Sequence, residues 1–247
     1  MAGHSHWAGI KHKKGKADKQ RSKLFSKLSR EITVAAKLGM PDPDMNPRLR
    51  SAVQAAKEAN MPKDNIDRAI KKSQGNDEAN YEAVVYEGFG PSGTAMIVEA
   101  LTDNKNRTIS NMRSIFEKNG YSLGTEGSVS YQFEICGLIK IKKDSCSEDE
   151  IFEQSTNFGA EDFKVEGDFY EIYTKKNNLH EIQSELEKKY QLNFCGIIYN
   201  PKSSIKVEKQ DFEKIISFID ALEDDDDVQK VYSNFEVDEK ILTEMSS

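Results

Sequence analysis

The 247-residue sequence has few cysteines, one tryptophan and no long run of apolar residues. Its cysteines, Cys136, Cys146 and Cys195, are odd in number and include no C-x-x-C pair, which fits a reducing compartment and provides no thiolate metal site. The apolar stretch GTAMIVEALTD is interrupted by Glu99 and is far shorter than the ~20 residues of a membrane span. A secretory signal has an apolar segment after its basic residues, and the basic N-terminus of this sequence has none. We therefore expect a cytoplasmic protein with no membrane partner.

The sequence also lacks the common catalytic motifs. It contains no H-E-x-x-H, no G-x-S-x-G and no glycine-rich nucleotide fingerprint, and YEGFGPSGT lacks the Gly-Lys-Ser/Thr ending of a phosphate loop, so it is interpreted as a tight turn. His180 has no paired Cys or Ser motif, and His4, His6 and His12 are interpreted as part of a polar arm, not as metal ligands. A catalytic pair of carboxylates stays an open alternative, because only the tertiary structure decides which carboxylates lie close together. We expect no enzyme activity, no metal and no cofactor.

What the sequence does have is charge, and the two signs are segregated. The whole chain has a net charge of −7. Residues 1–80 carry 17 Lys and Arg against 9 Asp and Glu, net +8, which leaves net −15 for the remainder. Such asymmetry indicates a cationic module joined to an acidic body, and a cationic module favours an anionic partner.

Residues 16–38 have the periodicity of an amphipathic helix. Its apolar face contains Leu24, Phe25, Leu28, Ile32, Ala35 and Leu38. The opposite face is basic and contains Lys16, Lys19, Lys23, Lys27, Arg30 and Lys37. Only Asp18 and Glu31 interrupt the basic residues, whereas a merely solvated helix usually mixes both signs. Together with the preceding arm KHKKGK, this basic stripe suits a phosphate backbone, with a solvated charged face as the alternative.

Two further helices follow the basic one. Asn46 and Pro47 provide an N-cap and an N1 residue for the first, which turns Leu49, Val53 and Ala56 inward. The second begins at Pro62, ends at Gly75 and turns Ile66, Ala69 and Ile70 inward. A helix-turn-helix that reads bases through the second helix stays an alternative; its polar residues are Lys63, Asn65, Arg68, Lys71 and Lys72. We expect residues 1–76 to form an all-helical basic domain.

The acidic remainder alternates strand and helix patterns. We expect a discontinuous α/β domain from residues 77–134 and 205–247, with strands at 94–101, 128–135 and 228–237. Residues 135–204 read as a complete βαββαβ unit, beginning with a strand at 137–143, which predicts an inserted ferredoxin-like domain. The expected fold class is α+β and multidomain, and the strand around Val231 should pair with residues 94–134, not with the inserted sheet.

Two charged features lie in the acidic body. Lys105 and Arg107 stand near a predicted helix start and form a possible second anion site. The run Glu223–Asp227 could hold Mg²⁺, but consecutive side chains on a turn point apart, so a solvated loop is preferred.

Several long segments resemble the YebC/PmpR family. They are AGHSHWAGIKHKK, NPRLRSAVQAAKEANMPKDNIDRAIKK, YEGFGPSGTAMIVEALTDNKNRTISNMRSIF, LGTEGSVSYQF and IDALEDDDDVQKVYSNFEV. The resemblance covers essentially the whole chain and is weakest over 135–205. It implies a helical N-terminal domain, two α/β domains with one inserted in the other, and a DNA-binding transcriptional regulator. Mitochondrial and other relatives are translation factors or activators that act with the ribosome or mRNA.

The family's basic N-terminal pattern implies the nucleic-acid-binding positions of this chain. It falls on Lys11, Lys13, Lys14, Lys19, Arg21, Lys23, Lys27 and Arg30, to which the basic stripe adds Lys16. His6 stands where many relatives have Lys. Our hypothesis is a nucleic-acid-binding regulator of gene expression that contacts phosphates of DNA or RNA as a monomer. A ribosome- or RNA-associated translation factor and a protein-interaction adaptor that uses open sheets are the alternatives.

Overall fold

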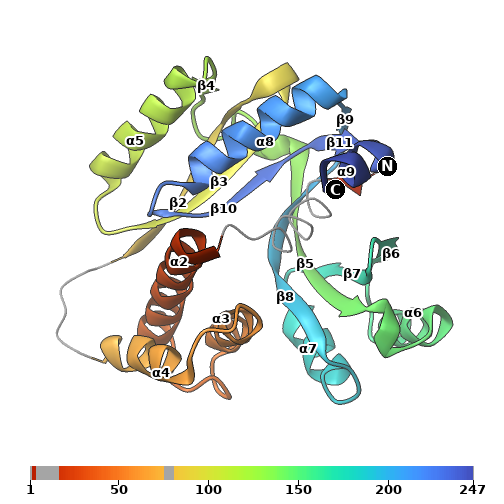
Figure 1. Ribbon diagram of the computed structural model, residues 1–247. Coiled ribbons are helices and arrows are strands. Elements are labelled where there is room, and N and C mark those ends of the chain that lie inside the picture. Colours follow the sequence, from red (N-terminus) through yellow and green to blue (C-terminus); the bar gives the residue numbers. More distant parts are fainter. Residues whose placement is uncertain (1, 4–16, 75–80, 247) are drawn as a thin grey trace. The chain divides into compact units, whose positions relative to one another are not determined.

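The computed structural model in Figure 1 describes residues 2–3, 17–74 and 81–246. The chain divides into two compact units. Unit 1 comprises residues 1–34, 75–134 and 201–247, and unit 2 comprises residues 35–74 and 135–200. Both contain helices, and each contains a four-stranded sheet, so the predicted α+β class is confirmed. The predicted domain boundaries stay a prediction. No helix within these described residues is long and apolar enough to cross a membrane.

The long basic helix α2 forms over Ala17–Leu38, close to the predicted 16–38. Its apolar face is used as expected at Ile32 and Ala35, which are buried. Leu38, however, is 71% exposed, so its predicted inward position is wrong. The helix ends at this residue, and burial in its last turn stops at Ala36, so that Lys37 and Leu38 are exposed.

Two short helices follow in unit 2, α3 (Pro47–Glu58) and α4 (Lys63–Lys72). Asn46 caps α3 as predicted, because its side-chain oxygen accepts from the Leu49 amide at 3.1 Å. Its Nδ2 also donates to the carbonyls of Ala35 and Met40, both at 2.8 Å. This one buried side chain thus joins the end of α2 to the start of α3. Five of the six residues predicted to point inward are buried: Leu49, Val53, Ala56, Ile66 and Ala69. The sixth, Ile70, is partly exposed. The predicted stop at Gly75 lies outside the described residues.

The main sheet of unit 1 has the order β10-β3-β2-β4. The antiparallel strands β2 and β3 pair from Glu82↔Thr102 to Phe89↔Ala95. The turn predicted for YEGFGPSGT is confirmed, because the 3₁₀ turn η1 lies there and places Ser92 at φ 55°. Strand β10 pairs with β3 through Val231↔Val98, as expected for the strand around Val231. The strands are β2 (Glu82–Phe89), β3 (Ala95–Thr102), β4 (Ser122–Leu123) and β10 (Val228–Ser233).

Helices α5 (Lys105–Lys118) and α8 (Lys209–Glu223) bury their apolar sides in one core with this sheet (Figure 1). Phe116 and Phe218 meet edge to face there, with ring centroids 4.9 Å apart. The C-terminal segment adds α9 (Glu239–Ser246). A separate small sheet has the order β1-β11-β9, from β1 (Ala2–Gly3), β9 (Ile205–Lys206) and β11 (Phe235–Val237).

Strand β1 corrects the expectation that residues 1–76 are entirely helical. Ala2 pairs with Val237 and Gly3 with Glu236, so the first residues extend a sheet made by the end of the chain. The pairing is main-chain hydrogen bonding at a strand edge, which a two-residue segment satisfies without any periodic side-chain pattern.

The sheet of unit 2 has the order β6-β7-β5-β8, which is the ferredoxin-like arrangement of a βαββαβ unit. The elements are β5 (Phe133–Lys142), the 3₁₀ turn η3 (Lys143–Ser145), α6 (Glu148–Asn157), β6 (Asp162–Glu166), β7 (Phe169–Lys175), α7 (Leu179–Leu186) and β8 (Leu192–Pro201). The sequence predicted two strands, 128–135 and 137–143. A 3₁₀ turn, η2 (Ser130–Gln132), precedes a single continuous β5 instead, because Gly137 fits within the ladder opposite Thr174.

Candidate nucleic-acid interface

Three of the predicted phosphate-contact residues lie one helical turn apart on α2. Lys23, Lys27 and Arg30 recur at spacings of four and three residues and therefore share one side of the helix. All three donate hydrogen bonds to a single acidic segment, Glu223–Asp227, which ends α8 and leads into β10. The basic stripe thus has an anionic partner within unit 1.

Lys23 and Lys27 bind the C-terminal end of α8. The Nζ of Lys23 lies 2.6 Å from Asp224 Oδ1 and 3.1 Å from the Asp224 carbonyl oxygen. The Nζ of Lys27 donates to the Glu223 carbonyl at 2.6 Å. The last carbonyls of a helix have no intrahelical donor and carry partial negative charge, which cations stabilise. These lysines therefore act as a C-cap supplied by another helix.

Arg30 lies deeper than Lys23, because 19% of its side chain is exposed against 31% for Lys23. Its Nη1 donates to the carbonyls of Leu101 at 3.0 Å and Asp226 at 2.8 Å and to Asp227 Oδ1 at 2.8 Å. Its guanidinium also lies 5.1 Å from the ring centroid of Tyr81. These contacts join α2 to the end of β3 and to the start of β10.

Asp227 is the centre of this network, and its side chain is 4% exposed. Besides Arg30, its carboxylate accepts from Arg107 Nη2 at 2.7 Å, Thr108 Oγ1 at 2.8 Å and Thr102 Oγ1 at 3.2 Å. Burial alone would raise the pKa of this carboxyl. The hydrogen bonds from Arg107 and Thr108 and the charges of both arginines outweigh burial and hold the pKa below its ordinary value. Asp227 is therefore ionised at neutral pH.

The buried position of Asp227 corrects the expectation that Glu223–Asp227 is a solvated loop. Asp224 is 77% exposed, but Asp225 accepts from Asn111 Nδ2 at 2.8 Å and from the Asp227 amide at 2.9 Å. Within the described part of the chain, no group of three or more His, Cys, Asp and Glu residues could hold a metal ion. Aspartates of the same run therefore differ in burial and in their contacts, and composition alone could not distinguish them.

The predicted second anion site has carboxylate partners for both of its cations. Lys105 forms an ion pair with Glu82. Arg107 pairs with Asp103 at 2.9 Å and with Asp227 at 2.7 Å. An incoming anion at this helix start would compete with these carboxylates.

The other predicted contact residues continue toward the N-terminus. Arg21 lies on α2 and is exposed. The main chain of Lys19 belongs to the same helix. The positions Lys11, Lys13, Lys14 and Lys16 lie outside the described residues. In unit 2, α4 presents further exposed basic residues, among them Lys63 and Lys71, while Arg68 donates to Asn65 Oδ1 at 2.6 Å.

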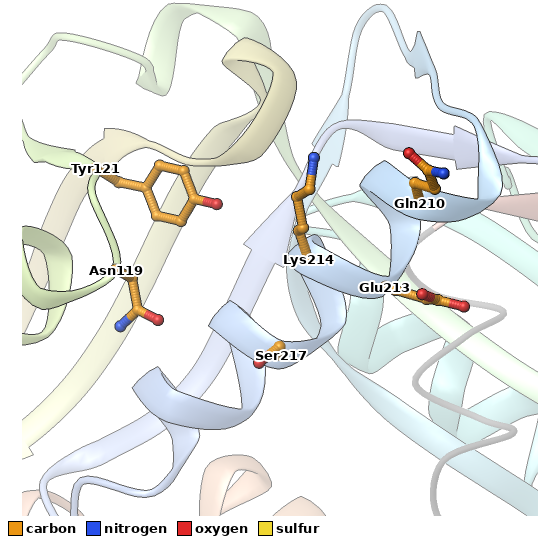
Figure 2. A pocket seen from close by; sticks show the side chains of 6 residues that line it. All are labelled: Asn119, Tyr121, Gln210, Glu213, Lys214 and Ser217. Atoms are coloured by element: carbon orange, nitrogen blue, oxygen red, sulfur yellow. The ribbon is translucent and has the colours of Figure 1, made fainter.

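A second surface feature of unit 1 is a hollow of about 450 Å³ beside α8. Figure 2 shows Tyr121 and Asn119 facing the helix that carries Lys214 and Ser217; Gln210 and Glu213 complete the lining. Lys214 is paired with Asp211 at 3.0 Å. The lining mixes amide, hydroxyl, carboxylate and ammonium groups, and we assign it no ligand.

Comparison with known proteins gives matches over nearly the whole chain. Residues 5–76 match the family described as TACO1/YebC protein N-terminal domain, and residues 81–235 match TACO1/YebC second and third domain. A probable transcriptional regulatory protein of Pelagibacter ubique is 58% identical over 236 residues, which cover 95% of this chain and 98% of that protein. The crystal structure of a conserved hypothetical protein from Aquifex aeolicus is similar with a TM-score of 0.85 and 47% identity, covering 96% of this chain and 99% of that one.

Proposed function

This chain belongs to the TACO1/YebC family, and we propose that it regulates gene expression as a transcriptional regulator that binds DNA. The observation that carries the proposal is the net charge of +8 on residues 1–80 beside −15 on the rest. The relative from Pelagibacter ubique is named a probable transcriptional regulatory protein, which supports the regulatory part.

We assign phosphate binding to the N-terminal basic segment. The contact residues are Lys11, Lys13, Lys14, Lys16, Lys19, Arg21, Lys23 and Lys27, together with Arg30, which adds positive charge to the stripe while its guanidinium stays bound to Asp227. Arg21 is exposed on α2 and supports this assignment directly. Lysine and arginine neutralise phosphates and release condensed counterions, which supplies most of the affinity of a sequence-independent contact. Lys105 and Arg107 are proposed as a secondary contact that opens only when their carboxylate partners are displaced.

The acidic remainder limits where nucleic acid can bind. A polyanion that approaches the net −15 portion is repelled, while the basic segment attracts it, so the duplex is directed to one part of the chain. We propose that the role is binding and not catalysis. The buried carboxylate of Asp227 is engaged in structural ion pairs and hydrogen bonds, which supports a binding role.

A ribosome- or RNA-associated translation factor is the alternative. RNA carries the same phosphates as DNA, so the basic segment would serve either partner. The ferredoxin-like order β6-β7-β5-β8 in unit 2 is a topology that RNA-binding domains also use, and this observation favours the alternative. A protein-interaction adaptor is the remaining possibility if no nucleic acid binds.

Crosslinking in cells, followed by identification of the bound nucleic acid, tests the proposal. Recovery of duplex DNA fragments supports the transcriptional regulator, and recovery of ribosomal or messenger RNA supports the alternative. A matched chain in which Lys14, Lys16, Lys19 and Arg21 are changed to Gln should recover much less of either. Equal recovery from both chains would contradict an electrostatic contact through the basic segment.

A further inference from the structure

The acidic segment Glu223–Asp227 occupies cations that we assign to phosphate binding. We propose that its solvent-facing part is an intramolecular competitor, an autoinhibitory contact that nucleic acid phosphates must displace from Lys23 and Lys27. This inference rests on the proposed function, because it concerns the same basic segment. It adds an internal contact that lowers the affinity of the basic segment for phosphates.

The contacts on α2 fall into two classes by depth. Arg30 and Asp227 have side chains 19% and 4% exposed, and each makes several further hydrogen bonds. Removing one partner of such a buried pair leaves an uncompensated charge, so this contact persists. Lys23 and Asp224 are 31% and 77% exposed, and exposed ion pairs contribute little and are screened by salt. The exchange is therefore confined to the outer pair and to Lys27 beside it.

The acceptors that Lys23 and Lys27 use resemble phosphate oxygens in what they offer. Lys23 binds a carboxylate oxygen and a main-chain carbonyl, and Lys27 binds a main-chain carbonyl at the negative end of α8. A lysine ammonium is a point charge on a flexible stem, so it can leave these oxygens for a phosphate through rotamer changes alone. The main chain of α2 can stay in place, since Arg30 holds it to β3 and β10.

Such a competitor makes binding selective for ligands with many phosphates. A single anion must break the contact with the acidic segment to gain one ion pair, and the exchange is nearly neutral. A nucleic acid also binds the cations that precede Lys23, and these additional ion pairs make the displacement of the acidic segment favourable. The segment would therefore suppress weak binding of small anions more than binding of an extended phosphate backbone.

The test removes the side-chain charges of the competitor, while the main-chain carbonyls that Lys23 and Lys27 bind and the buried centre stay in place. The variant Glu223→Gln/Asp224→Asn retains Asp225 and Asp227. The matched control, Glu117→Gln/Glu126→Gln, changes the net charge equally at two exposed sites of unit 1. Affinity is measured by fluorescence anisotropy with a short labelled duplex DNA and a labelled RNA hairpin at several salt concentrations. The competitor variant should bind about two- to fivefold more tightly than the control at low salt, and the advantage should shrink as salt rises.

A coupling measurement separates competition from a general effect of charge. In the native chain, Lys23→Gln removes a phosphate contact that forms only after Lys23 leaves Asp224, so it should lower affinity modestly. In the Glu223→Gln/Asp224→Asn chain, the same substitution should cost several-fold more affinity. Equal costs, or equal affinity of the competitor and control variants, would overturn the inference while the proposed function stands. Failure of the native chain to bind either probe would overturn both.

Discussion

Arg30 of α2 donates to Asp227, the residue directly before β10, over a distance of 2.8 Å, although 197 positions separate them in the sequence. The same carboxylate also accepts from Arg107 of α5. One buried anion thus holds together the basic helix and the sheet of unit 1. The contact explains why Arg30 belongs to both the predicted stripe and the structural core.

Replacing Asp227 by Asn should therefore destabilise the protein strongly. Both arginines would lose their shared counter-charge in a site with 4% exposure, and breaking a buried ion pair costs about 3–5 kcal/mol in the free energy of unfolding. Urea unfolding followed by circular dichroism measures the change. Asp224→Asn is the control, because its pair with Lys23 is exposed and should contribute less than about 1 kcal/mol. Equal effects of the two substitutions would refute the central role of Asp227.

Acid should weaken the fold through Glu87 as well as Asp227. Burial alone would raise the pKa of Glu87, but hydrogen bonds from the amides of Gly127, Val129 and Ser130, at 2.8–2.9 Å, lower it. A lowered folded-state pKa gives stability that is present above the unfolded-state pKa and is lost as the pH falls through the folded-state value. Unfolding free energy should therefore decrease below about pH 5.

Glu87→Gln isolates that contribution. An amide oxygen can replace only one of the two carboxylate oxygens that these three N–H groups reach, so the substitution should cost about 1–3 kcal/mol at neutral pH. The variant should also show a flatter dependence of unfolding free energy on pH between about 3 and 5. A pH profile parallel to that of the native chain would show that Glu87 is not ionised in the folded protein.

Asn46 offers a test of the join between α2 and α3. Asn46→Ala removes the N-cap of α3 and leaves the carbonyl groups of Ala35 and Met40 without this donor. Loss of the cap alone costs about 1–2 kcal/mol, and the lost donors add to it. Thermal unfolding measures the effect. A midpoint that does not decrease would show that the cap is dispensable.

The helix-turn-helix alternative is tested on α4. Lys63 and Lys71 are exposed on this helix, and changing both to Gln should reduce affinity less than changing Lys19 and Arg21, since our account places the phosphate contacts on the N-terminal segment. Binding is compared on a panel of DNA sequences. A selective loss for some sequences would instead identify α4 as a helix that reads bases, because phosphate contacts carry no sequence information.

Much of this fold could be predicted from local patterns. The apolar periodicity of α2, the Asn46 cap and the βαββαβ order of unit 2 are encoded in neighbouring residues. Strand β2 was missed, because its residues Glu82–Phe89 do not alternate clearly and include Gly88 and two glutamates. One of them, Glu87, is buried in a nest of amides that only the folded loop creates.

The candidate site could be predicted only in part. The charge segregation identified the cations on α2, but their acidic partners lie nearly 200 positions away and are fixed by the packing of α8 and β10. Nothing local distinguishes Asp227 from the aspartates before it, except that it directly precedes a strand. The pairing of Arg107 with the same carboxylate is likewise a tertiary property.

The salt dependence of binding tests the central claim most directly. If the basic segment neutralises about five phosphates, the slope of log K against log salt should be about −4.5 on duplex DNA and about −3.5 on a single strand. Changing Lys14, Lys16, Lys19 and Arg21 to Gln should lower affinity for every sequence and flatten the slope by about one for each lost phosphate contact. A correctly folded variant with unchanged affinity and slope on DNA, and unchanged co-sedimentation with ribosomes, would show that the basic segment is only a solvated face.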